Sequence, residues 1–343
     1  MSAKTIVLFN HKGGVSKTTS TYNIAWKLTD LGKRVLIVDG DPQCNLTSLI
    51  LDDNFDDYYE TPATSQLNIK DAVKVAFEGR PKAISAIDCV NSTKNSNLFL
   101  LPGHPNLSEY DPSLSLAMNS NNAITTLQNL PGAFNELIRL CSDKYNIDYV
   151  FIDMNPGLSA INQAFVISAD AFIIPTNPDP FSIMALRTLK NILPRWKQWA
   201  TNSRSLFVDA AYPIPDKEVK FIGHLIQRFN LRKGKAARPY QDRILEIKSV
   251  IETELVPELV NYNMCFDISS LIISGIIADF CLAEISEFGA LLQKSHEHAV
   301  PVFKLNDEQI GNRGPIFDQL SGNRKLFDEI FEKIAKVIIN ILQ

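Results

Sequence analysis

The chain has 343 residues, of which 45% are hydrophobic, and its 34 basic and 38 acidic side chains give a net charge of −4. This composition predicts a globular protein with a large buried core and excludes a disordered or tail-like chain. The slightly negative charge excludes bulk basicity as a means of binding nucleic acid, so any such binding requires a local patch of lysine and arginine.

Apolar strand-like runs alternate with helical stretches along the chain. The first run, 5–10, is followed by a helix over 18–31 that should stop at Gly32, and then by a second run over 34–41. This order makes a βαβ unit, which implies a parallel sheet. Further elements follow: strands at 98–103, 149–154, 171–177 and 221–229, and helices at 132–143, 158–169, 181–200 and 239–256. The pattern predicts an α/β fold with a doubly wound, mostly parallel sheet flanked by helices.

We expect residues 1–343 to form one domain, because doubly wound proteins of about 250 residues or more often do. Polar, weakly periodic stretches at about 51–97, 104–125 and 200–220 are expected as peripheral insertions. Apolar residues at helical spacing predict an amphipathic helix over 324–342.

The compartment is indicated by what the sequence lacks. The five cysteines form no Cys-x-x-Cys pair, which argues against a zinc site, a cluster scaffold and a disulfide framework. The first ten residues lack the basic and long apolar regions of a signal peptide. The most apolar later stretch, 271–282, is shorter than the ~20 apolar residues of a spanning helix. We expect a cytoplasmic protein without a transmembrane segment.

The segment 10–19, NHKGGVSKTT, has the order that a phosphate site needs: a strand, a glycine-containing loop, Lys-Thr and a helix. Gly13 and Gly14 allow a tight turn in which backbone N–H groups and the helix N-terminus point at a phosphate. Lys17 would bridge the β- and γ-phosphates, and the Thr18 hydroxyl would coordinate Mg²⁺.

The loop departs from the common pattern G-x-x-x-x-G-K-[ST], because His11 and Ser16 occupy its two glycine positions. It resembles instead the deviant Walker A box, K-G-G-x-x-K-[ST], of the ParA/MinD family of P-loop ATPases, with Lys12 as the second lysine. The resemblance implies a homodimer formed with ATP, in which Lys12 reaches the partner's nucleotide. It also implies that ATP and Mg²⁺ are bound by the loop residues Gly13, Gly14, Val15, Ser16, Lys17, Thr18 and Thr19.

Two carboxylate segments fall where the family would place them. DGDPQCN resembles the D-x-D-P-Q-x-N segment, in which Asp41 would orient the attacking water and Asp39 would support the magnesium shell. FIDMNPGL resembles the Walker B and switch segment, in which Asp153 would hold Mg²⁺ through water. The resemblance thus implies that Lys12, Lys17 and Asp41 are catalytic and that Thr18, Asp39 and Asp153 serve the metal.

Two later segments resemble the adenine side of the family's site. GHLIQRF, at 223–229, resembles the strand that ends near the base, which predicts a base contact by Gln227. The stretch 284–305 resembles the loop and helix that close over the base.

In the resembled family, ATP joins two subunits into a dimer that binds a surface, and slow hydrolysis releases it. The leading hypothesis is a ParA-type partitioning or positioning ATPase that lacks an N-terminal DNA-binding domain. Its dimer would bind DNA without sequence preference and would answer to a ParB-like or other activator protein. The protein would then associate with the nucleoid. A basic cluster fits such a backbone-binding patch, and its members are Arg228, Arg232, Lys233, Lys235 and Arg238.

The sequence argues against two alternative functions and leaves a third open. A MinD-like membrane-surface protein would use the 324–342 helix, but the polar face of that helix mixes acidic with basic residues, which favours packing on the protein. A metal-cluster carrier of the same superfamily would need the missing Cys-x-x-Cys pair. An accessory ATPase of a mobile-element or defence operon, acting through a partner protein, stays open.

Overall fold

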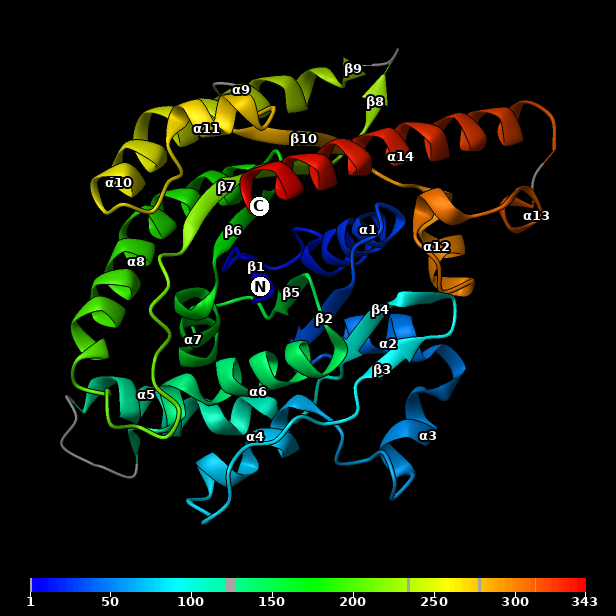
Figure 1. Ribbon diagram of the computed structural model, residues 1–343. Coiled ribbons are helices and arrows are strands. Elements are labelled where there is room, and N and C mark those ends of the chain that lie inside the picture. Colours follow the sequence, from blue (N-terminus) through cyan, green and yellow to red (C-terminus); the bar gives the residue numbers. More distant parts are fainter. Residues whose placement is uncertain (1, 121–126, 233–234, 277–278, 312) are drawn as a thin grey trace.

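The computed structural model describes residues 2–120, 127–232, 235–276, 279–311 and 313–343. Its main sheet has eight strands in the order β10–β7–β6–β1–β5–β2–β4–β3 (Figure 1). In chain order they are β1 (Lys4–Leu8), β2 (Val35–Gly40), β3 (Val90–Ser92), β4 (Asn95–Leu101), β5 (Tyr149–Met154), β6 (Ala171–Thr176), β7 (Lys220–Phe229) and β10 (Cys281–Ser286). Neighbouring strands are parallel except β3, which runs antiparallel to β4. The predicted doubly wound, mostly parallel sheet is therefore confirmed.

Helices cover both faces of this sheet (Figure 1). On one face α1 and α14 pack on each other, with α1 also against β2, β4 and β5 and α14 also against β10. On the other face α4 contacts β2, α7 contacts β1, and α6 joins α4 to α7. The α-helices are α1 (Lys17–Asp30), α2 (Asn45–Leu51), α3 (Phe55–Glu60), α4 (Ile69–Phe77), α5 (Asp111–Asn119), α6 (Leu130–Tyr145), α7 (Ala160–Ser168), α8 (Pro180–Arg204), α9 (Arg238–Val250), α10 (Val256–Asn261), α11 (Ile268–Ile273), α12 (Ala290–Glu297), α13 (Asp307–Ile310) and α14 (Pro315–Ile341).

The central strands have the near-continuous apolar sequences that burial on both faces requires. Every residue of β2, β5 and β6 is buried. The helix between β1 and β2 ends as predicted, because Gly32 follows its C-cap with a left-handed φ of 79°. Because these strands are buried, they fix the positions at which the loops that follow them begin.

Some elements differ from the sequence-based expectation. The strand β10 was not predicted, and only its last three residues fall within 284–305, for which a loop and a helix were expected. The short strands β8 (Leu231–Arg232) and β9 (Lys235–Ala236) pair as a separate two-stranded sheet. The single helix predicted over 239–256 is instead α9, a π-helical turn at Ile251–Leu255, and α10.

The C-terminal helix α14 buries its apolar stripe, including Phe327, Phe331, Ile334 and Ile338. It is also tied to α1, because Asp328 forms an ion pair with the buried ammonium of Lys27. The helix thus packs on the protein, as its mixed polar face indicated. Among the described residues, none of the helices combines the length and the apolar character that crossing a bilayer requires.

Candidate nucleotide site

The predicted site residues meet at one edge of the sheet, because parallel strands bring their carboxyl ends together. The loop 9–16 follows β1, and Asp41 follows β2 directly. Asp39 on β2 lies in register with Asp153 on β5, and Asp153 in turn lies beside Leu8 on β1. Segments from the first half of the chain are thus brought to one place.

The loop before α1 has the backbone of an anion-binding turn. Gly14 and Ser16 both adopt left-handed conformations, with φ of 71° and 55°. Alternation of right- and left-handed residues makes consecutive N–H groups converge on one point. The helix begins at Lys17, and its N-cap residue Ser16 makes no side-chain cap, so the first N–H groups of the helix are left for an anion.

Lys17 is 7% exposed and lies within this loop. Its Nζ donates hydrogen bonds to the carbonyl oxygens of Asn10 and Lys12, at 3.1 and 3.2 Å. Burial lowers the pKa of its ammonium group, since a charge away from water is costly. A bound phosphate would stabilise the charged form of Lys17, because its negative oxygens would lie beside the ammonium group.

Asp153 is the least satisfied acid of the site. Both of its carboxylate oxygens are buried, and neither accepts a hydrogen bond of ordinary geometry in the part of the chain that the structure describes, although the Thr18 side chain lies close enough to lower the pKa of this carboxyl. Burial and the nearby carboxylate of Asp39 raise its pKa to about 8. Buried acceptors of this kind are costly unless a cation or donor reaches them. The donor set of Asp153 and the adjacent Thr18 therefore fits a hard divalent cation such as Mg²⁺.

Asp39 has a different environment. Its Oδ2 accepts hydrogen bonds from the N–H and the hydroxyl of Thr47, at 2.8 and 2.7 Å, and its Oδ1 accepts one from the N–H of Asp41 at 3.2 Å. Burial raises its pKa to about 6. These contacts fix the loop that carries Asp41, so Asp39 is arranged to hold that loop.

A cavity of about 870 Å³ opens beside the loop. Its first wall is formed by residues 13–19 and a second by Asp41 and residues of α2 and the turn after it. A third wall is formed by residues 285–289 and two residues of α12, which is the segment expected to cover the base. The cavity thus extends from the phosphate loop to the predicted base side.

Gln227 lines this cavity but is only 1% exposed. Its Oε1 accepts a hydrogen bond from the hydroxyl of Ser20 at 2.8 Å, and its Nε2 donates one to the carbonyl of Val15 at 3.2 Å. Both ends of the amide are therefore used within the chain. The predicted base contact by Gln227 stays a prediction.

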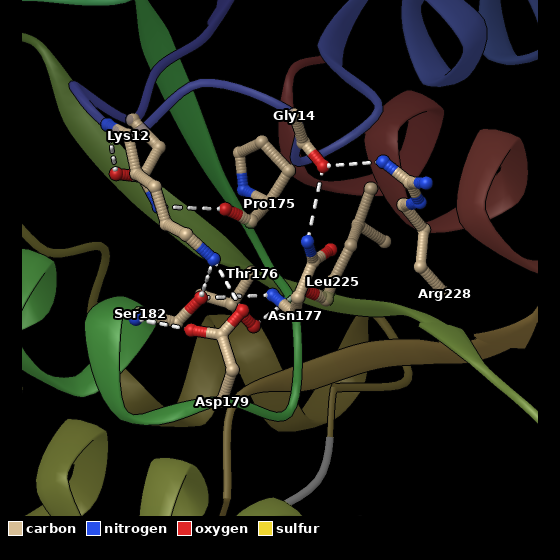
Figure 2. A network of polar contacts seen from close by, with 10 residues as sticks. Lys12, Gly14, Pro175, Thr176, Asn177, Asp179, Ser182, Leu225 and Arg228 are labelled. Carbon is tan, nitrogen blue, oxygen red and sulfur yellow. Dashed lines mark hydrogen bonds and ion pairs between the residues drawn. The ribbon is translucent and has the colours of Figure 1, made fainter.

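Lys12 is not among the residues that line the cavity. Its ammonium forms an ion pair with Asp179 and a 3.2 Å hydrogen bond with the hydroxyl of Ser182 (Figure 2). Asp179 is the N-cap of α8, where its Oδ1 accepts from the N–H of Ser182. The lysine expected to act on a partner subunit is thus held within its own chain.

The predicted basic cluster is spread over several environments. The guanidinium of Arg228 donates to the carbonyl of Gly14, whereas Arg238 is exposed at the start of α9. Arg232 and Lys235 lie in the paired strands β8 and β9. Lys233 lies outside the described residues.

The sequence did not predict four residues that contact the site residues Asp39, Gly14 and Lys12. They are Thr47, Asn177, Asp179 and Ser182. Asp179 and Ser182 stand in the pattern Asp-Pro-x-Ser, which signals a helix N-cap but not a contact with Lys12. Thr47 and Asn177 carry no local signal of their contacts with Asp39 and Gly14.

Comparison with known proteins agrees with this arrangement. The AAA domain family (AAA_31) matches residues 3–205. The sporulation initiation inhibitor protein Soj of Bacillus subtilis is 28% identical over 194 residues, which are 55% of this chain and 64% of Soj. The virulence plasmid ParA family protein pGP5-D of Chlamydia muridarum is 25% identical over 199 residues, which are 55% of this chain and 61% of that protein. The chain thus spans less than two thirds of the length of both relatives.

Solved structures share the fold. The protein DIP2308 of Corynebacterium diphtheriae superposes with a TM-score of 0.61 at 24% identity, over 86% of this chain and 97% of its own. A putative plasmid partition protein of Borrelia burgdorferi, bound to AMPPNP, gives 0.57 at 19% identity over 98% of each chain. Because the family match covers more than half of the sequence, the protein belongs to the AAA_31 family of P-loop ATPases, the ParA/Soj type that its deviant Walker A box resembles.

Proposed function

We propose that the protein is a Mg²⁺-dependent ATPase of the partitioning or positioning type, which forms a homodimer with ATP and binds DNA in that state. The observation that supports the nucleotide chemistry best is Asp153, whose two buried oxygens accept no hydrogen bond of ordinary geometry among the described residues. This carboxylate belongs to the same sheet edge as the anion-binding loop and Lys17. The Borrelia burgdorferi relative bound to AMPPNP is consistent with a nucleotide in this fold.

Phosphoryl transfer to water depends on positioned charge, and the site supplies it from several sides. When bound, Mg²⁺ would neutralise charge on the β- and γ-phosphates, with Thr18 and Asp153 as the residues that hold it. The ammonium of Lys17 would give up its hydrogen bonds to the carbonyl oxygens of Asn10 and Lys12 and donate to phosphate oxygens instead. Asp41 lines the cavity, and its carboxylate would orient the attacking water.

Two substitutions separate binding from hydrolysis. Lys17→Ala should abolish ATP binding, because the loop loses its only side-chain cation inside the cavity wall formed by 13–19. Asp41→Ala should retain ATP binding and lose hydrolysis. Calorimetric titration and phosphate release measure the two steps. Unchanged hydrolysis in Asp41→Ala would contradict the role given to that carboxylate.

The dimer is proposed from the deviant Walker A box, in which Lys12 serves the partner subunit. Lys12 does not line the nucleotide cavity of its own subunit, which is consistent with a role at the nucleotide of the partner subunit. The DNA-binding surface is proposed from the basic residues at the end of β7, the β8–β9 pair and the start of α9. A ParB-like or other activator would then accelerate hydrolysis and release the dimer.

The surface that the dimer binds can be tested directly. The ATP-loaded protein should bind duplex DNA, with a salt dependence typical of phosphate contacts, and should not bind anionic vesicles. Reversing the charge of Arg232 and Arg238 should weaken DNA binding and lower its salt slope. Full retention of DNA binding by that variant would refute the patch, and vesicle binding alone would favour a membrane-surface protein instead.

A further inference from the structure

The carbonyl oxygen of Gly14 is held by two side chains from distant parts of the chain. Asn177, just after β6, donates from Nδ2 at 3.0 Å, and Arg228, near the end of β7, donates from Nη1 at 3.0 Å. Figure 2 shows the two side chains meeting at this oxygen. The next carbonyl, of Val15, is held in the same way by Gln227.

These bonds fix the direction of the loop's N–H groups. In a trans peptide unit the C=O and the following N–H lie in one plane and point in opposite directions. Holding the Gly14 carbonyl therefore turns the N–H of Val15 away from Asn177 and Arg228. Holding the Val15 carbonyl does the same for the N–H of Ser16. Val15 and Ser16 both line the cavity, so their N–H groups are set in place for an anion before one binds.

Arg228 reaches Gly14 from an unusual backbone position. Its φ is 60°, in the left-handed region that favours glycine. It is also bulged out of the sheet, because Gln227 pairs with Ile285 and Phe229 with Ser286, which leaves Arg228 unpaired between them. Bulges beside functional sites serve to re-aim a side chain, and strain is retained where it serves a purpose.

We propose that Asn177 and Arg228 are positioning residues of the phosphate cradle, which raise affinity for phosphate by holding the Gly14 carbonyl outward. Asn177 is not among the residues that line the cavity, so it acts through the loop and not on the ligand. Arg228 does line the cavity, so the Asn177 variant is the one that separates positioning from direct contact with the ligand. This inference rests on the proposed nucleotide site, and it assigns Arg228 to that site in place of the DNA surface.

The test compares affinity and stability in the same variants. Dissociation constants for Mg·ADP are measured by calorimetry for the full chain, together with urea unfolding in the absence of nucleotide. Asn177→Ala and Arg228→Gly should each weaken ADP binding about fivefold, the factor typical of one hydrogen bond. Arg228→Gly should be at least as stable as the wild type, because glycine relieves the left-handed strain. Arg195→Ala, which removes an exposed arginine of α8 outside the cavity lining, should bind ADP like the wild type.

The outcomes are distinct. Weaker ADP binding in both variants, without loss of stability in Arg228→Gly, supports the positioning role. Wild-type ADP affinity in either variant overturns it, as does an equal loss in Arg195→Ala, which would indicate a general effect of charge. Failure of the wild type to bind Mg·ADP would refute the proposed function itself.

Discussion

Asp179→Asn isolates the contact that holds Lys12 within its own chain. Asp179 has two tasks, since one oxygen caps α8 by accepting from the N–H of Ser182 and the other pairs with the Lys12 ammonium. Asparagine caps a helix about as well as aspartate, but it carries no charge. The substitution therefore keeps the start of α8 and removes the ion pair.

The size of the effect follows from the exposure of the two side chains. Lys12 and Asp179 are 20% and 32% exposed, so solvent screens the pair and about 1 kcal/mol is a fair value for it. If each Lys12 must leave its Asp179 to reach the partner's ATP, a dimer breaks two such pairs. Removing both should favour the dimer by about 2 kcal/mol, which is roughly a 30-fold lower dissociation constant.

Sedimentation velocity over a range of protein concentrations, with AMPPNP and Mg²⁺, gives that constant. Asp179→Ala serves as a control for the cap, because it should also lose about 1 kcal/mol of stability. On a Lys12→Ala background, Asp179→Asn should have no effect on the dimer. A dimer no tighter in Asp179→Asn than in the wild type would refute the idea that this ion pair competes with the dimer.

Three further predictions concern stability, measured by urea unfolding. Burial raises the pKa of Asp153 to about 8, so the folded state binds more protons than the unfolded state between pH 4 and 8, and stability falls as pH rises through that window. Asp153→Asn should therefore stabilise the nucleotide-free protein at pH 8, by on the order of 5 kcal/mol at most. The variant should also lose the Mg²⁺-dependent part of its ADP binding. Equal stability of the variant and the wild type at pH 8 would contradict this prediction. Asp328→Ala should cost about 1 kcal/mol, because it leaves the buried ammonium of Lys27 with Asp30, 3.6 Å away, and the ring of Phe303 as its remaining contacts among the described residues; no loss would indicate that the contact with α14 is unimportant. Gly32→Ala should cost about 1 kcal/mol through its left-handed φ alone, since a Cβ there meets open space, and a neutral result would count against that backbone strain.

The sequence predicted the central sheet closely because its strands are buried on both faces. β5 has the predicted bounds, 149–154, and every one of its residues is buried. β10 was missed because it lies at the edge of the sheet, where Ala283, Glu284 and Ser286 stay partly or fully exposed. Its sequence therefore lacks the continuous apolar run that marked the inner strands. The π-helical turn in the 239–256 region was equally out of reach, because apolar spacing does not distinguish one extra residue per turn.

The candidate site divides in the same way between local and long-range features. The loop residues could be predicted because glycine, lysine and threonine at fixed spacing are a local signal of a phosphate-binding turn. The contacts that hold this turn come from Asn177 and Arg228, which lie 163 and 214 residues away from Gly14. Only the fold decides that Arg228 faces the loop while Arg238, ten residues further on, is exposed. A run of basic residues in the sequence therefore does not identify one surface. Any DNA-binding test on this protein has to treat Arg228 apart from Arg232 and Arg238, because Arg228 also contacts the phosphate loop and a change there should alter nucleotide binding as well.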